Sequence, residues 1–121
     1  MPNILILGAG GIGLPIASAL KHEEYNLVLS DYSQSAIDKA KEYFGRTKFD
    51  SECSIDFHHG IGKSYLLENK HDFDIVVSAL PYYENKDVAQ LCIPEGISYV
   101  DLGGHVETTH CIRALAEGYG S

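Results

Sequence analysis

The feature that most constrains the fold of this chain is a glycine-rich turn that directly follows a short apolar run. The run is Ile4 to Leu7, and Gly8-Ala9-Gly10-Gly11-Ile12-Gly13 follows it with glycines in G-x-G-x-x-G spacing. Beyond the turn, Ile12, Ile16 and Leu20 recur at the interval of one helical face. A buried strand, a glycine turn and a helix in this order are typical of the first unit of a nucleotide-binding α/β sheet.

Each glycine of the turn meets a separate need of a bound pyrophosphate. Gly8 permits the tight turn, Gly10 lets phosphates approach the backbone, and Gly13 lets the helix pack closely on the strand. Backbone amides at the start of the helix, together with the helix dipole, can then hold the phosphates. We therefore predict that the pyrophosphate of a dinucleotide contacts Gly8, Ala9, Gly10, Gly11, Ile12 and Gly13.

An acidic residue at the end of the next apolar run completes this pattern. Leu27 to Leu29 predicts a second buried strand, which ends at Ser30 and Asp31. A carboxylate in this place can accept hydrogen bonds from both hydroxyls of the adenosine ribose, and it would repel a 2′-phosphate. Tyr32 and its next neighbours are neutral, and no arginine follows closely. The sequence therefore favours NAD over NADP, with Asp31 and Tyr32 at the cofactor.

The rest of the chain alternates apolar runs with helical patterns. Further strands are expected at 53–57, near the sheet edge, and at 74–78 and 97–100, with helices around 36–44, 63–70, 88–92 and 112–116. Ser35 and Asp38 have the spacing of a capping box, and Gly45 is expected to cap the same helix at its end. We predict an α/β fold, a Rossmann-type doubly wound parallel sheet of strand order 3-2-1-4-5, forming a single dinucleotide-binding domain over residues 1–121.

Composition and charge exclude several classes of partner. The 121 residues are 45% hydrophobic, which suits one globular domain. A net charge of −8 argues against nucleic acid and against a membrane surface. The glycines interrupt the early apolar run, so neither a secretory signal nor a membrane span is expected. Three widely spaced cysteines fit reduced thiols in the cytoplasm, and no metal site is predicted.

Several other motifs are chemically incomplete. Gly62-Lys63-Ser64 resembles the end of a Walker A loop, but Phe57 stands where that motif needs its first glycine. His58 and His59 would point to opposite faces of a strand, so they could not easily share a metal. No G-x-S-x-G elbow occurs in the sequence, so no hydrolase is predicted and no catalytic residue is named. Tyr82-Tyr83 is expected to line a cleft or an interface.

Three segments lie at the carboxyl ends of predicted parallel strands, namely Asp31, 78–82 and 101–105. In open α/β sheets, ligands bind outside these ends, at the switch point between the first and fourth strands. The turn Ala79-Leu80-Pro81 is therefore expected beside the pyrophosphate or the nicotinamide ribose. The segment from Asp101 to Gly104 is expected near the nicotinamide.

The fourth and fifth predicted strands and the helix between them lie in three segments, Asp74 to Tyr83, Val88-Ala89 and Gly96 to His105. These segments resemble those of the saccharopine dehydrogenase family, in particular its lysine 6-dehydrogenase and saccharopine reductase-like members. With the glycine turn and the acid after the second strand, the resemblance covers nearly the whole chain. It implies hydride transfer between a nicotinamide cofactor and a carbon that bears an amino-acid nitrogen. It also implies that Asp56 contacts the adenine region. Ala79, Leu80 and Pro81 would border the nicotinamide ribose, and Asp101 and Gly103 would lie at the nicotinamide ring.

Members of that family continue into a substrate and dimerisation domain. We therefore expect residues 1–121 to be the cofactor-binding portion of a longer dehydrogenase, without turnover of their own; an amino-acid substrate and a homodimer would belong to the full-length protein. Two other function classes stay open. One is a nucleotide-sensing regulatory domain that binds NAD or ATP without chemistry, and the other is a methyltransferase that uses S-adenosylmethionine.

Overall fold

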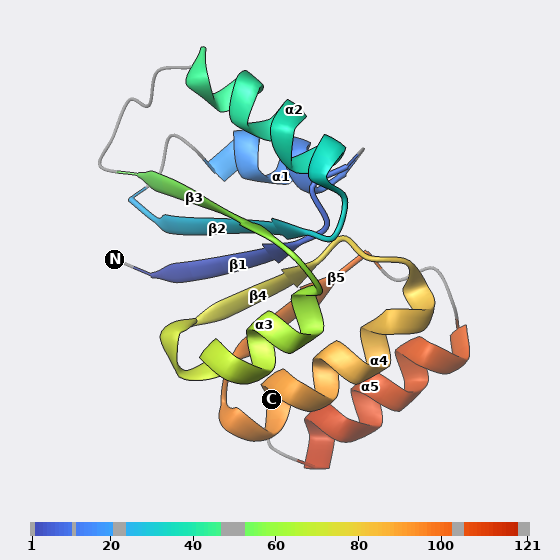
Figure 1. Cartoon of the computed structure of the whole chain (residues 1–121). Helices are drawn as coiled ribbons and strands as arrows, with labels where there is room; N and C mark the ends of the chain where they lie inside the picture. Colours follow the sequence, from blue (N-terminus) through green and yellow to red (C-terminus); the bar gives the residue numbers. More distant parts are fainter. Residues whose placement is uncertain (1, 11, 21–23, 47–52, 103–105, 119–121) are drawn as a thin grey trace.

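The computed structural model has a parallel five-stranded sheet between two layers of helices (Figure 1). It describes residues 2–10, 12–20, 24–46, 53–102 and 106–118. The strands are β1 (Asn3–Leu7), β2 (Asn26–Asp31), β3 (Ser54–His59), β4 (Ile75–Ser78) and β5 (Ser98–Asp101). The helices are α1 (Gly13–Leu20), α2 (Gln34–Gly45), α3 (Gly62–Asn69), α4 (Tyr82–Cys92) and α5 (Val106–Gly118), with 3-10 turns η1 (Lys70–Asp72) and η2 (Ile93–Glu95). No helix in the described ranges combines the length and apolar character that a bilayer crossing needs.

The strand order is β3-β2-β1-β4-β5, which confirms the predicted order 3-2-1-4-5 and the Rossmann-type fold class. The central strand, β1, pairs in parallel with both β2 and β4. In that register its last residue, Leu7, lies opposite Ser30 of β2 and Ser78 of β4. The carboxyl ends of these three strands therefore lie level at one edge of the sheet, where the chain leaves each strand for a helix.

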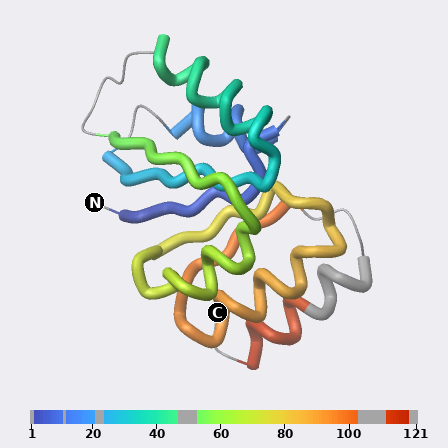
Figure 2. The backbone as a smooth tube through the Cα atoms, viewed as in Figure 1, coloured from blue at the N-terminus to red at the C-terminus, as the bar shows by residue number. Residues whose placement is uncertain are grey.

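The side chains of β1 alternate between two apolar cores, one on each face of the sheet. Ile4 and Ile6 belong to the core that contains Ala17 of α1 and the inner face of α2. Leu5 and Leu7 belong to the core on the other face, with residues of α3 and α4. Figure 2 shows these two layers, α1 with α2 against one face and α3, α4 and α5 against the other. The continuous apolar run of β1 is thus explained by burial on both faces.

The two outer strands are less covered than the middle ones. β3 pairs with β2, and β5 pairs with β4, so each forms an edge of the sheet. On β5, Val100 is 52% exposed. On β3, Asp56 is exposed, whereas Ile55 and Phe57 are partly buried against the α2 side. The prediction that the third strand lies near a sheet edge is confirmed.

The ends of α2 differ from the sequence prediction. Ser33, not Ser35, is the N-cap, and its hydroxyl accepts a hydrogen bond from the backbone N–H of Ala36 at 3.2 Å. The chain turns this early because the carboxylate of Asp31 accepts the backbone N–H of Ser33 at 2.8 Å. At the other end, Gly45 is the last helical residue and does not adopt the left-handed conformation, so it is not the predicted cap.

Candidate functional site

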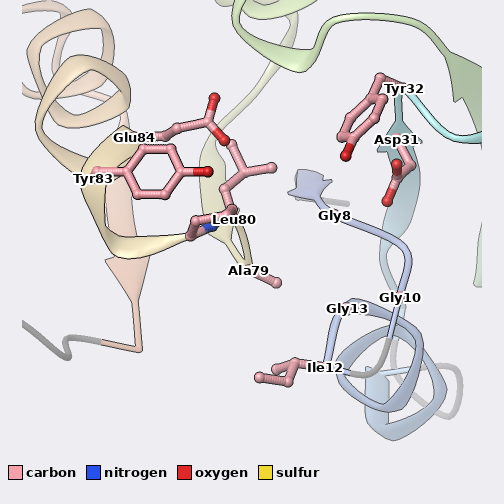
Figure 3. A pocket seen from close by; sticks show the side chains of 11 residues that line it. Gly8, Gly10, Ile12, Gly13, Asp31, Tyr32, Ala79, Leu80, Tyr83 and Glu84 are labelled. Atoms are coloured by element: carbon pink, nitrogen blue, oxygen red, sulfur yellow. The ribbon is translucent and has the colours of Figure 1, made fainter.

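A cavity of about 380 Å³ opens at the carboxyl edge of the sheet, between the ends of β1 and β2 and the start of α4 (Figure 3). It lies at the switch point between β1 and β4, as expected for a ligand site in an open α/β sheet. Residues that the sequence singled out come together in its lining: Gly8, Gly10, Ile12, Gly13, Asp31, Tyr32, Ala79, Leu80 and Pro81. The lining also contains Tyr83 and Glu84.

The glycine turn is closely packed at two positions and open at the third. Gly8 has a φ of +100°, and a Cβ atom there would lie 2.9 Å from the carbonyl oxygen of Ala79. A Cβ atom on Gly13 would lie only 1.4 Å from the carbonyl oxygen of Gly8. A Cβ atom on Gly10 would meet no atom within 4 Å. Gly8 and Gly13 therefore build the turn, whereas Gly10 leaves open space above the backbone.

Backbone hydrogen bonds hold the turn against both neighbouring strands. The N–H of Gly8 donates to the carbonyl of Ser30 at 2.7 Å, and the N–H of Ala79 donates to the carbonyl of Leu7 at 2.8 Å. At the start of α1, Leu14 makes the first helical bond, to the carbonyl of Gly10 at 3.4 Å. The amides of Ile12 and Gly13 precede this bond and have no carbonyl within the helix to bind, which makes the start of α1 suited to an anion.

Two backbone N–H groups hold the carboxylate of Asp31 in place. Its Oδ2 accepts the N–H of Ala9 at 2.8 Å, and its Oδ1 accepts the N–H of Ser33 at 2.8 Å. Each oxygen of a carboxylate can accept two hydrogen bonds. Each of these two oxygens therefore keeps capacity for a further donor, and the side chain is already oriented. Ala9 itself is buried and does not line the cavity.

The opposite side of the cavity comes from the first turn of α4. Figure 3 shows Tyr83 and Glu84 facing Asp31 and Tyr32 across the opening, with Leu80 between the two sides. Tyr83 is 69% exposed and lines the cavity, as predicted for the tyrosine pair, whereas Tyr82 is not among the lining residues. The sequence prediction missed Glu84, although its position just after the β4 turn was a signal, since helix starts at this edge of the sheet face the ligand site.

A second cavity, of about 160 Å³, adjoins the first on the α3 side of the sheet. The two cavities share Asp31, Tyr32, Leu80 and Glu84, so they lie side by side, and we call them together the cleft. The second cavity also draws on the β3–α3 connection, which the sequence prediction left out. Its remaining lining residues are Leu7, Ser30, Ile61, Gly62 and Lys63.

Two adjacent histidines support the end of β2 beneath this cleft. His58 shares a 2.8 Å hydrogen bond between its Nδ1 and the Oγ of Ser30, and its ring lies 4.0 Å from that of Tyr65. Burial lowers the pKa of His58, and the nearby His59 lowers it further. His59 contacts the carbonyl oxygen of Tyr32 through Nε2 at 2.9 Å. Within the described residues, no group of three or more histidines, cysteines or acids is placed to hold a metal ion.

The structure does not bring two of the predicted acids to the cleft. Asp101, at the end of β5, accepts a 2.7 Å hydrogen bond from the hydroxyl of Tyr99. Burial raises the pKa of Tyr99, and the bond to Asp101 raises it further, so this hydroxyl remains a donor. Asp56 lies in the middle of β3, opposite Val28, and lines neither cavity. Gly11 and Gly103 lie outside the described residues.

Residues 4–119 match the family model described as the saccharopine dehydrogenase NADP binding domain. No curated protein sequence matches the chain. Among solved structures, it is similar to a saccharopine dehydrogenase (L-Glu forming) from Saccharomyces cerevisiae, with a TM-score of 0.69 and 19% identity over 95% of this chain. It also resembles a myo-inositol dehydrogenase from Corynebacterium glutamicum (TM-score 0.65, 17% identity, 98% of this chain) and a spermidine synthase from Thermotoga maritima (TM-score 0.64, 16% identity, 98% of this chain).

These solved proteins are much longer than the present chain, which covers 24%, 34% and 45% of them, respectively. At such low identities, the likeness shows a shared fold and nothing finer. The fold is common to proteins with different ligands, so the ligand has to be argued from the residues of the cleft.

Proposed function

This chain belongs to the family of the saccharopine dehydrogenase NADP binding domain, and from that premise we propose that it binds a nicotinamide dinucleotide along the cleft at the carboxyl edge of the sheet. One observation carries the proposal: the glycine turn and Asp31 line the same cavity. Gly10 leaves open space beside the first turn of α1, and Asp31 has hydrogen-bonding capacity toward that space. Phosphates fit the first feature, and a ribose fits the second.

The binding roles follow the order of the elements along the cleft. We assign the pyrophosphate to the turn Gly8 to Gly13 and the adenosine ribose to Asp31, beside Tyr32. Ala79, Leu80 and Pro81 line the same cavity from the β4 side and would border the nicotinamide ribose. The family resemblance adds Asp56 toward adenine and Asp101 with Gly103 toward the nicotinamide ring. Asp56 and Asp101 line neither cavity, and Gly103 lies outside the described residues.

We further propose that this chain prefers NAD, although the description of its family names NADP. The carboxylate of Asp31 can bind the ribose hydroxyls of NAD and would repel the 2′-phosphate of NADP. Glu84 lines the same cavity and adds a second carboxylate to it. Both acids therefore act against a ligand that carries an additional doubly charged phosphate.

The reaction we propose is hydride transfer at a carbon that bears an amino-acid nitrogen. The bound nicotinamide would supply the hydride chemistry, and the residues of this chain would position it. The groups that hold the amino acid, and the contacts of a homodimer, would come from residues beyond 1–121. We place the protein in the cytoplasm, which suits the free thiols of Cys53 and Cys92.

Calorimetric titration of the chain with NAD, NADP and ATP tests the ligand class. NAD should bind most tightly; ATP binding as tight as NAD would favour the nucleotide-sensing alternative instead. Gly10→Val should abolish binding, because its side chain fills the space above the turn. Gly45→Val is the matched control, since a Cβ atom on Gly45 also meets no atom within 4 Å and Gly45 lies outside the cleft. Normal binding by Gly10→Val would contradict the proposed site.

The cofactor preference has its own test. Asp31→Asn removes the charge that repels a 2′-phosphate, and its one amide oxygen keeps an acceptor for only one of the two N–H groups, of Ala9 and Ser33, that Asp31 binds. The ratio of the NADP Kd to the NAD Kd should therefore fall by about tenfold in this variant. A ratio equal to that of the wild type would remove Asp31 from the ribose site.

A further inference from the structure

One lysine stands in an otherwise acidic cleft. Of the residues that line the two cavities in the described part of the chain, Lys63 alone is a lysine or arginine. It lies in the first turn of α3 and lines the smaller cavity, together with Asp31. A 2′-phosphate on a ribose held by Asp31 would therefore enter the space that both side chains border.

This lysine is already paired with two acids of α4. Its Nζ lies 3.5 Å from Oε1 of Glu84 and 3.5 Å from Oδ2 of Asp87. The two acids are three positions apart in α4, so they project from the same side of that helix. The lysine and Glu84 side chains are 33% and 28% exposed, so the pair is only partly screened by water.

We propose that Glu84 and Asp87 hold Lys63 as a masked phosphate-binding residue, and that this trio sets the preference between NAD and NADP together with Asp31. The inference rests on the proposed function, because it assumes that a dinucleotide occupies the cleft. A 2′-phosphate can bind Lys63 only by displacing two carboxylates that lie within 4 Å of the ammonium. NAD carries hydroxyls at the ribose and leaves the trio intact.

The charges in this part of the cleft explain why the lysine alone does not attract a phosphate. The single positive charge of Lys63 is outweighed by the two negative charges of Glu84 and Asp87, and Asp31 adds a third negative charge beside it. The interaction between two unit charges about 6 Å apart, in partly screened surroundings, changes a binding equilibrium constant by roughly tenfold. Removing both acids of α4 leaves Lys63 beside Asp31 alone, so the local charge rises from −2 (one lysine, three acids) to zero (one lysine, one acid), and the unmasked ammonium should become a phosphate ligand.

The test measures the ratio of the NADP Kd to the NAD Kd in the wild type and in Glu84→Gln/Asp87→Asn. Adenosine 2′,5′-bisphosphate and AMP give the same comparison at the adenosine end alone. The double variant should lower the ratio by about tenfold or more. A triple variant that adds Lys63→Gln should lose most of that gain, because the phosphate then has no lysine to bind and only the loss of the carboxylates' repulsion remains.

A matched control is available at the other end of α3. Lys70 and Glu95 form a 2.8 Å ion pair outside the lining of both cavities. Glu95→Gln changes the same kind of charge, and it should leave the ratio unchanged. Far-ultraviolet circular dichroism and the urea midpoint of each variant confirm that it is folded before its Kd values are compared.

The outcomes separate the two levels of the proposal. A wild type that binds neither dinucleotide overturns the proposed function and this inference with it. Two outcomes overturn the role of the trio but leave dinucleotide binding intact. One is a wild type that prefers NADP; the other is a wild type that prefers NAD while the double variant shows the same ratio of the NADP Kd to the NAD Kd. A triple variant that keeps the full gain assigns the effect to the general field of the acids and removes Lys63 from the phosphate site.

Discussion

Replacing Gly13 with alanine is the most direct test of how this turn is built. The new Cβ atom would lie 1.4 Å from the carbonyl oxygen of Gly8, whereas ordinary contact begins near 3.4 Å. Helix and turn would have to separate by about 2 Å, and the obstacle is backbone, which cannot turn away as a side chain can. We expect the free energy of unfolding to fall by about 3 kcal/mol, at the upper end of the overpacking range.

Urea denaturation followed by circular dichroism measures this loss, and Gly10→Ala supplies the control. The Cβ atom of that control meets no atom within 4 Å, so its free energy of unfolding should lie within about 0.5 kcal/mol of the wild-type value. A Gly13→Ala protein as stable as the wild type would refute the close packing of α1 on the turn. Equal destabilisation in both variants would refute the distinction between a glycine that builds the turn and one that leaves room for a ligand.

Two further predictions concern the buried polar and thiol groups. Asn85 is 2% exposed and accepts a 2.9 Å hydrogen bond from the hydroxyl of Ser78, so Asn85→Ala should cost about 2 kcal/mol in the same urea assay; a cost under about 0.5 kcal/mol would show that the bond contributes little. Burial raises the pKa of Cys92 to about 12 from 9.0. As pH rises, the thiol ionises at a lower pH in the unfolded chain than in the folded protein. The stability that the neutral thiol contributes is therefore complete below about pH 9 and is lost as pH rises toward 12. The difference in unfolding free energy between the wild type and Cys92→Ala should change over this interval, and a constant difference would contradict the prediction.

The fold and half of the cleft follow from local signals in the sequence. The buried strands are continuous apolar runs. The turn after β1 needs glycine at positions 8 and 13, because a Cβ atom at either position would collide with the backbone. The place of the acid after β2 is also visible in the sequence, although its contacts are only partly local. Asp31 bonds to Ser33, which is near it in the chain, and to Ala9, which the pairing of β1 with β2 brings close. Alternation of strands and helices then restricts the topology to few possibilities, and the predicted order is the one found.

The direction of individual side chains was harder to predict. Asp56 stands on the predicted third strand and Asp101 directly follows the predicted fifth strand, yet neither lines the cleft. Asp101 instead accepts a hydrogen bond from Tyr99, two residues earlier in β5. At the start of α2, the carboxylate of Asp31 and the hydroxyl of Ser33 shift the helix cap away from the position that the pattern of Ser35 indicates. Competition between several nearby donors and acceptors decides such details.

The amino-acid sequence by itself determined that parallel strands would end at a common edge of the sheet. It also placed the glycine turn and Asp31 at that edge. Only the tertiary structure decided that Lys63 of α3 would meet Glu84 and Asp87 of α4 across the cleft. The reason is physical. Strand, turn and cap preferences act between residues that are close in the chain, whereas an ion pair between two helices depends on how both helices pack against the same face of the sheet.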